Sequence, residues 1–302
     1  MEKKKSSRMT LVRQLENEGF RFSELVLTSE GEYAPEDADW NYKDIPHLHH
    51  VHALAEALPA TIDRDMICSI NLQRIFGLWV PITLVNYEYE KDCQVYFTTL
   101  LMFALIIETR WEAIGKIHTR VTTTYSIGYP RWLFFAVPLL KWTIRRNYRV
   151  LMSEDIPMRT RRGALRKLGY SFKMEGPSYG FPSTTKIMES NLELPPHAER
   201  RIVCSYKEAL AGQSEALIGD IGLLGFRLVQ DGADFLIFTR ACPHEGASLD
   251  QVICDRGTLR CRWHGRRVSP IGRFTPGHDT EFTQEGYRVQ VTGDQLTIER
   301  QN

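Results

Sequence analysis

Two cysteine–histidine pairs lie close together in the last third of the sequence. Cys242-x-His244 is followed, after the sixteen residues 245–260, by Cys261-x-x-His264. Two thiolates can hold one iron of a two-iron, two-sulfur cluster while two imidazoles hold the other, and the neutral imidazoles raise the reduction potential. Zinc is the alternative metal, because two cysteines and two histidines also form zinc sites, although zinc usually takes its cysteines from Cys-x₂₋₄-Cys pairs.

A second group of potential metal ligands lies near the N-terminal end, where residues 41–52 read NYKDIPHLHHVH. Asp44, His47 and His52 are separated by two and four residues. Two histidines and one carboxylate on one face of Fe(II) leave positions open for substrate-controlled O₂ binding. In a regular helix, however, five residues turn by about 140°, so His49 with His52 is a competing pair.

These segments resemble a known family. CPHEGASL and CRWHG resemble the two ligand loops of Rieske proteins, and the likeness extends over about residues 200–300. The spacing from Asp44 to His52 is similar to the iron-ligand motif of the Rieske non-haem iron oxygenases. The resemblance implies a [2Fe-2S] cluster held by Cys242, His244, Cys261 and His264, and a mononuclear Fe(II) held by His47, His52 and Asp155. Glu154 competes with Asp155 as the third ligand of that iron.

The same resemblance gives Asp44 a catalytic role. In the family, the matching aspartate bridges a cluster histidine to an iron-ligand histidine, usually across a subunit boundary. It implies that Asp44 links His244 or His264 to His47 in a homo-oligomer of the trimer-ring type. Asn41 would be a weak or indirect contact near the iron.

Two features depart from the family pattern. The domain order is reversed, because the catalytic region comes before the Rieske region. The loops also lack the extra cysteine pair and the serine of respiratory Rieske proteins, and Arg266 follows Gly265. Fewer hydrogen bonds to the sulfurs would keep the potential low, as in the oxygenase and ferredoxin branch of the family.

The expected fold class is α+β. We expect residues 1–175 to form a helix-grip (START-like) catalytic domain, 176–199 a linker rich in Gly, Pro and Ser, and 200–302 a small all-β Rieske domain. The first domain combines an antiparallel sheet with a long C-terminal helix over about residues 131–168, ending at Gly169. Expected strands are 84–90, 94–109 and 116–127, whereas the first thirty-odd residues are expected to be partly irregular.

Composition excludes several function classes. The 302 residues carry a formal net charge of +1, which gives no general attraction to nucleic acid. The six cysteines fit metal binding in a reducing compartment, so the expected location is the cytoplasm, with Cys254 a buried thiol. The apolar runs 96–107 and 132–140 are too short to span a membrane. The arginines after residue 140 leave a peripheral membrane contact as an alternative to simple burial.

The expected function is that of an oxygenase. Electrons from a nicotinamide-dependent reductase, directly or through a ferredoxin, and O₂ would serve to hydroxylate, dihydroxylate or desaturate an apolar, cyclic or isoprenoid substrate. The alternative is a non-catalytic lipid- or polyketide-binding helix-grip domain fused to a Rieske electron carrier. The basic run 145–167 is interpreted either as a solvated helix face or as a docking patch for an acidic ferredoxin.

Overall fold

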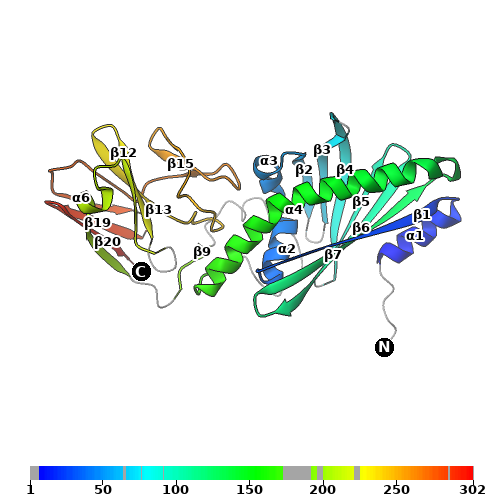
Figure 1. Ribbon diagram of the computed structural model, residues 1–302, viewed down its shortest axis with the longest axis horizontal. Coiled ribbons are helices and arrows are strands. Elements are labelled where there is room, and N and C mark those ends of the chain that lie inside the picture. The colour runs from blue at the N-terminus through cyan, green and yellow to red at the C-terminus, as the bar shows by residue number, and fades with distance from the viewer. Residues whose placement is uncertain are drawn as a thin grey trace. The chain divides into compact units, whose positions relative to one another are not determined.

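The computed structural model describes residues 7–63, 66–75, 77–90, 92–172, 192–195, 200–220, 225–284 and 286–301. Contacts divide the chain into two compact units, Met1–Gly163 with Met174–Met188, and Ala164–Lys173 with Glu189–Asn302. Figure 1 shows their elements, and each unit is described by itself. Most of the expected linker, 176–199, lies outside the described residues. The domain limits 1–175 and 200–302 therefore stay predictions.

A seven-stranded antiparallel sheet forms the main part of the first unit. Its order is β1-β7-β6-β5-β4-β3-β2, so that β2 to β7 are consecutive hairpins and β1 adds to the outside of β7. The strands are β1 (Arg21–Gly31), β2 (Ala55–Asp63), β3 (Met66–Ile75), β4 (Leu78–Glu90), β5 (Cys93–Leu100), β6 (Phe103–Gly115) and β7 (His118–Tyr129).

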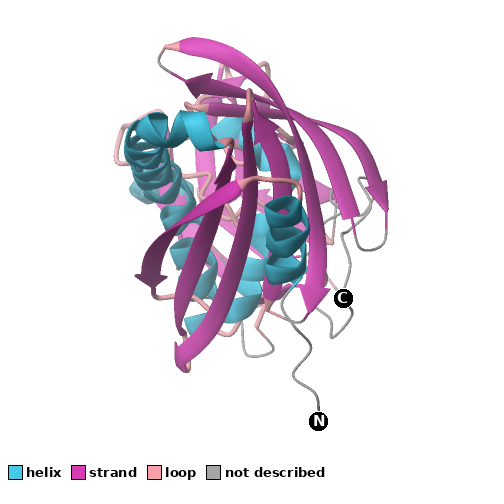
Figure 2. Ribbon diagram, turned by 90° about the vertical axis from the view of Figure 1, so that its right-hand side faces the viewer, coloured by secondary structure: helices cyan, strands magenta, loops and turns pink. Residues whose placement is uncertain are grey.

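Helices fill the curve of this sheet (Figure 2). The longest, α4 (Val137–Lys167), follows the short 3₁₀ helix η2 (Arg131–Ala136). The others are α1 (Ser7–Asn17), α2 (Pro35–Lys43), η1 (Ile45–His47) and α3 (Leu48–Val51). The Ser29 hydroxyl of β1 lies 3.6 Å from the sulfur of Met152 on α4. This antiparallel sheet with a long helix is the helix-grip arrangement expected from the sequence.

Several predicted elements of the first unit need correction. The single strand expected over 94–109 is two strands, β5 and β6, joined by a turn at Leu101 and Met102. Leu101 has a left-handed φ of 53° and is 88% exposed. Because the residues at this turn are apolar, their types do not indicate a turn. The first thirty residues also contain α1 and β1 rather than irregular chain. Helix α4 continues as one element through Pro157.

The second unit is all-β apart from short helices and the end of α4. Two four-stranded sheets, β10-β20-β19-β18 and β11-β12-β13-β17, enclose its core, and a three-stranded sheet is ordered β14-β15-β16. Glycines with left-handed φ form the hairpin turns at Gly232 and Gly293. The strands that carry the ligand loops are β13 (Asp234–Thr239), β15 (Thr258–Arg260) and β16 (Arg267–Val268).

The remaining strands of this unit are short. They are β8 (Ser171–Phe172), β9 (Leu192–Glu193), β10 (Arg201–Ser205), β11 (Glu215–Ile218), β12 (Phe226–Asp231), β14 (Cys254–Asp255), β17 (Gly272–Phe274), β18 (Thr280–Gln284), β19 (Tyr287–Thr292) and β20 (Gln295–Arg300). Helix α6 (Tyr206–Leu210) begins at Ser205, whose hydroxyl accepts a hydrogen bond from the amide of Glu208. The expected small all-β domain is thereby confirmed.

Gly163 sets how closely α4 approaches the chain that leaves β1. A Cβ atom at this position would lie 2.2 Å from the carbonyl oxygen of Glu32 and 2.8 Å from Cα of Tyr33. We expect Gly163→Ala to lower the free energy of unfolding by roughly 1–3 kcal/mol through overpacking. An unconstrained helix would instead gain about 1 kcal/mol from the same change. Thermal unfolding gives the sign, and a stabilised variant would contradict the close packing.

Candidate metal centres

Three elements bring the first group of ligands together. His47 ends η1, His52 directly follows α3, and Asp155 lies on α4. His52 has an extended backbone, with φ −88° and ψ 129°. The chain therefore leaves the helix before His52, and the rotation of about 140° that a regular helix would impose on the pair does not apply.

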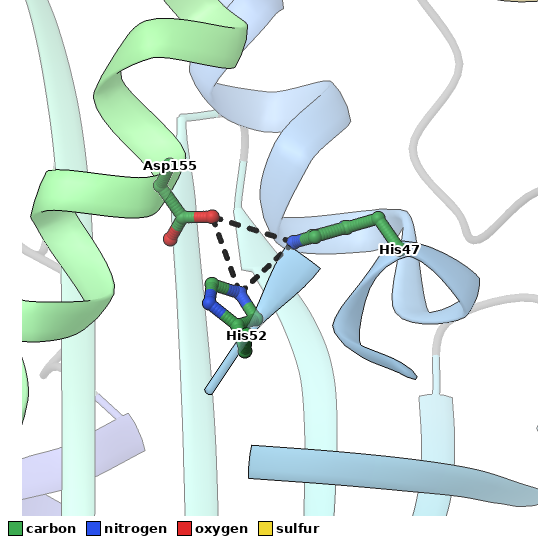
Figure 3. A group of neighbouring side chains, drawn as sticks. All are labelled: His47, His52 and Asp155. Carbon is green, nitrogen blue, oxygen red and sulfur yellow. Dashed lines mark hydrogen bonds and ion pairs between the residues drawn. The ribbon is translucent and has the colours of Figure 1, made fainter. Parts of the chain in front are cut away.

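Two imidazole nitrogens and one carboxylate oxygen converge on one point (Figure 3). Nε2 of His47 lies 3.2 Å from Nε2 of His52, and each nitrogen lies 3.3 Å from Oδ1 of Asp155. Ligands about 2.1 Å from a metal are about 3.0 Å apart in an octahedron and about 3.4 Å apart in a tetrahedron. The observed separations lie between these values, and all three side chains are buried. The donor set therefore fits a divalent transition metal such as Fe(II).

The outer nitrogens of both histidines have partners that leave Nε2 for the metal. Nδ1 of His47 lies against the carbonyl oxygen of Asp44, and Nδ1 of His52 is 2.7 Å from Oε2 of Glu154. Partners of this kind fix the ring orientation and make the ligating nitrogen more basic. The structure thus places Asp155 among the converging atoms and Glu154 on the far side of His52.

Electrostatics in the protein without metal favour one proton at this site. Burial lowers the pKa of His47, but the hydrogen bonds that its ring donates to Asp155 and Asp44 outweigh burial and raise that pKa to about 9. Burial raises the pKa of Asp155, yet its hydrogen bonds with His47 and His52 hold the pKa well below the ordinary carboxyl value. Because a histidine ligand must be neutral, metal binding here would displace a proton.

A buried arginine orients the site and was missed in the sequence. Nε and one terminal nitrogen of Arg159 donate to the side-chain oxygen of Asn41 at 2.8 and 2.5 Å. The amide nitrogen of Asn41 in turn donates to Oδ1 of Asp155 at 3.2 Å. Asn41 is therefore an indirect contact of the site, as the resemblance implied.

The basic run 145–167 is not one solvated face. Arg159 and Arg162 are both buried, and Arg162 pairs with Asp37 at 3.0 Å. The interpretation of the whole run as a solvated face or docking patch was therefore wrong at these positions. The signal was the spacing of Asp155, Arg159 and Arg162 at i, i+4 and i+7, which places all three on one face of a helix.

Other residues of the histidine-rich segment take different positions. His49 and His50 are exposed, with ring centroids 4.8 Å apart. Asp44 is buried, and its Oδ2 lies 3.6 Å from Nδ1 of His47. Asp44 thus contacts the histidine that it was expected to bridge, and its link to a cluster histidine stays a prediction.

In the second unit, the two Cys-His pairs lie in loops of the same backbone design. The amide of Cys242 donates to the carbonyl of Ala247, and the amide of Gly246 donates back to Cys242. The second loop repeats both bonds between Cys261 and residues 265 and 266. Gly246 and the glycine at 265 have left-handed φ values of 81° and 63°, which glycine adopts without strain.

The loops direct their four donor side chains toward one another. Nδ1 of His244 lies 3.2 Å from Nδ1 of His264. Hydrogen bonding between the two thiols raises the pKa of Cys242 and, together with other contacts, lowers that of Cys261 to about 5. Neither cysteine forms a disulfide, and the same holds for the other four described cysteines. Two sulfurs and two imidazole nitrogens fit a cluster with one iron of each ligand type.

An apolar contact supports the first of these loops. A Cβ atom on Gly246 would lie 2.5 Å from Cδ1 of Leu165, which is packed in a cluster with Tyr170 and Phe172. The loop therefore accepts only glycine beside this leucine. Cys254, expected to be a buried thiol, is only half-buried at the start of β14, so that expectation was wrong.

The family comparison decides the nature of the second unit. Residues 200–281 match the model of the Rieske [2Fe-2S] domain. This part of the chain is a Rieske domain. Apoptosis-inducing factor 3 of Mus musculus is 34% identical over 100 residues, which are 32% of this chain and 16% of the mouse protein. The human protein of that name is 36% identical over 63 residues, 21% of this chain and 10% of its own length. The chain thus spans only a small part of these relatives.

Solved structures similar to this chain include both single-domain and larger proteins. The Zhui aromatase/cyclase from Streptomyces sp. R1128 is 10% identical with a TM-score of 0.43, covering 47% of this chain and 96% of its own. Dicamba monooxygenase bound to 3,6-dichlorosalicylic acid is 11% identical with a TM-score of 0.36. The alignment covers 48% of this chain and 51% of the monooxygenase chain.

Glu154 offers a direct test of the mononuclear site. Glu154→Ala removes the acceptor at Nδ1 of His52 and leaves the three converging atoms in place. Loss of such a partner typically reduces metal affinity about 10–100-fold. Titration of the metal-free site with Co(II), followed by its visible absorption, measures the change. Ser153→Ala, an exposed neighbour on α4, is the control and should bind as the wild type does.

The Rieske domain predicts a coloured protein with a redox-active cluster. Replacement of His244 or His264 by alanine should abolish the visible absorption and the electron paramagnetic resonance signal of the reduced cluster, because each removes a ligand of one iron. His278→Ala, an exposed histidine of the same unit, should leave both signals intact. A colourless protein containing zinc would contradict the cluster.

Proposed function

We propose that this protein is a Rieske-type oxygenase. It would use O₂ and electrons from a nicotinamide cofactor, delivered through a reductase or a ferredoxin, to hydroxylate, dihydroxylate or desaturate a small apolar substrate. The observation that carries the proposal is the convergence of Nε2 of His47, Nε2 of His52 and Oδ1 of Asp155 in a chain that also contains a Rieske domain.

The cost of burying these groups favours a metal centre over a plain binding cavity. Burial of a carboxylate and two imidazoles is unfavourable unless each is paired. Here Asp44 and Glu154 pair with the outer nitrogens, which leaves both inner nitrogens facing Asp155. A domain that only binds a lipid or polyketide needs an apolar cavity, and this arrangement would add nothing to it.

The side chains of this unit would hold and orient the reacting groups. When bound, Fe(II) would supply the site of O₂ activation and the cluster would supply electrons. His47, His52 and Asp155 would hold the iron from one side and leave its other side open. Asn41 holds the carboxylate of Asp155 by a hydrogen bond, and Arg159 in turn fixes the Asn41 amide.

An open groove of the first unit is a candidate site for an apolar substrate. The groove has a volume of about 440 Å³ and lies between Thr28 and Ser29 of β1 and the α4 residues from Tyr148 to Pro157. Met152 and Ile156 line it together with the polar side chains of Arg149 and Ser153, and its exposed surface is mostly apolar. This volume falls within the roughly 300–1,000 Å³ that is typical of small-molecule sites. This mostly apolar surface would favour a ring or isoprenoid chain over a charged substrate.

Iron content of anaerobically purified protein tests the proposal. The wild type should contain about three iron atoms per chain, two in the cluster and one at the mononuclear site. His47→Ala should contain about two, with the cluster spectrum unchanged, because one of the three ligands of the single iron is lost. His49→Ala is the matched control, since His49 is exposed in the same segment, and it should keep the wild-type content.

The contrary outcome identifies the alternative function. About two irons in the wild type and in His47→Ala alike would indicate a Rieske electron carrier fused to a ligand-binding helix-grip domain. Substrate-dependent O₂ consumption with a reductase would then be absent as well. The trimer-type ring and the bridging role of Asp44 depend on the oxygenase assignment and would be abandoned with it.

A further inference from the structure

We propose that one end of the first unit docks on an anionic lipid bilayer. The surface consists of η2, the first turns of α4 and the two strand turns at residues 77–79 and 101–102. We call it the apolar end. The proposal goes beyond oxygenase chemistry and does not depend on it, because it rests on the exposure and charge of these segments alone.

The helical part of the apolar end exposes large apolar side chains. Phe134 and Phe135 are 67% and 65% exposed, and Trp132, Leu139 and Trp142 are each more than half exposed. Leu133 and Val137, between them, are buried in the unit. One face of this segment thus anchors it to the protein while the other presents aromatic rings to the surroundings. Isolated exposed apolar residues are ordinary, but a contiguous patch indicates an interaction site.

The strand turns add to the same end of the sheet. Ala104, just after the β5–β6 turn, pairs with Gly128 near the end of β7, three residues before η2 begins at Arg131. Strand β4 pairs with β5 through Leu84 and Thr98, so its first residues extend beyond that turn at the same end. Leu78 and Trp79 at one turn and Leu101 and Met102 at the other are exposed. Four further large apolar side chains therefore lie at this end.

Charge identifies the partner. Residues 128–150 contain Arg131, Lys141, Arg145, Arg146 and Arg149 and no acidic residue. Among the described residues, none of these five forms an ion pair, and Arg146 lies over the Trp142 ring at 5.9 Å. Two acidic side chains, Glu16 and Glu18, also lie near this end, because Arg21 at the start of β1 pairs with Tyr129 just before η2. The five basic side chains outnumber them. Aromatic rings flanked by long basic side chains are typical of proteins that lie on anionic membrane interfaces.

A second copy of the chain fits this surface less well. A symmetric dimer through the apolar end would place the same surface on both sides and so bring five basic groups against five others. A bilayer surface instead offers negative headgroups beside apolar chains. Among the described residues, no helix is long and apolar enough to cross a membrane. The contact would accordingly be peripheral.

Vesicle co-sedimentation of the full chain tests the proposal. The wild type should bind vesicles of equal parts phosphatidylcholine and phosphatidylserine more strongly than vesicles of phosphatidylcholine alone, and salt should weaken this binding. Phe134→Ser with Phe135→Ser should reduce binding at least about tenfold through loss of apolar contact. Arg131→Gln with Arg145→Gln should reduce it about 30-fold on the anionic vesicles and little on the neutral ones.

Matched variants on the second unit are the controls. Leu217→Ser with Ile253→Ser removes two exposed apolar side chains there, and Arg267→Gln with Arg300→Gln removes two exposed charges. Both pairs should bind as the wild type does, and all variants should keep the wild-type circular dichroism. The proposal is overturned if the wild type binds neither vesicle or if the apolar-end variants bind unchanged. It is also overturned if the phenylalanine variant only dissociates an oligomer and retains lipid binding.

Discussion

The carboxylate of Asp155 must be charged in the interior of the first unit, and much of that unit serves to make this tolerable. Two imidazoles, the amide of Asn41 and the guanidinium of Arg159 surround it. Removal of one partner from a buried charged group typically costs roughly 3–5 kcal/mol, because the remaining charge is left unpaired. Helix α2, the segment 45–52 and α4 are therefore coupled through this one carboxylate as well as through apolar packing.

The negative charge of Asp155 can be balanced either by a proton or by a metal ion. Without metal, a proton on His47 offsets the negative charge of Asp155, in keeping with the opposite directions of their pKa changes. A divalent cation would replace that proton among the same three atoms. Asp44 and Glu154 already contact the outer nitrogens, so the rings would not need to reorient to present Nε2 to a metal.

A feature could be predicted from the sequence when the residues that form it lie close together along the chain. The two Cys-His loops could be predicted because the four proposed ligands and their glycines lie within short segments. His47 and His52 could be proposed as a pair for the same reason, although the end of α3 between them was not predicted. Asp155 and Glu154 are neighbours in sequence, and only the packing of α4 determines which carboxylate faces the nitrogens. The helix-grip sheet was foreseen in outline, because the β-branched runs marked the later strands.

Other features could not be predicted, because they depend on contacts between distant segments or on residue types that fit more than one element. Arg159 looked like one of many cations in a basic run, and its burial depends on Asn41, over one hundred residues earlier. The turn at Leu101 has no glycine, proline or asparagine to mark it, so two strands were predicted as one. Strand β1 has a mixed polar pattern, and its pairing with β7 completes it.

The reversed order of the two domains has a limited physical effect on either centre. The four partners of Asp155 named above lie between 41 and 159, and the four proposed cluster ligands lie between 242 and 264, so each set of donor atoms lies within one unit. The order along the chain therefore cannot alter the donor atoms or their immediate partners. What it changes is the connection between the units, and Asp44 is the residue that bears on this. Its carboxylate lies beside His47, and a bridge to a cluster histidine requires a Rieske domain, of the same or another chain, to approach that side. The ligand chemistry thus follows from each unit alone, whereas cooperation between the centres depends on assembly.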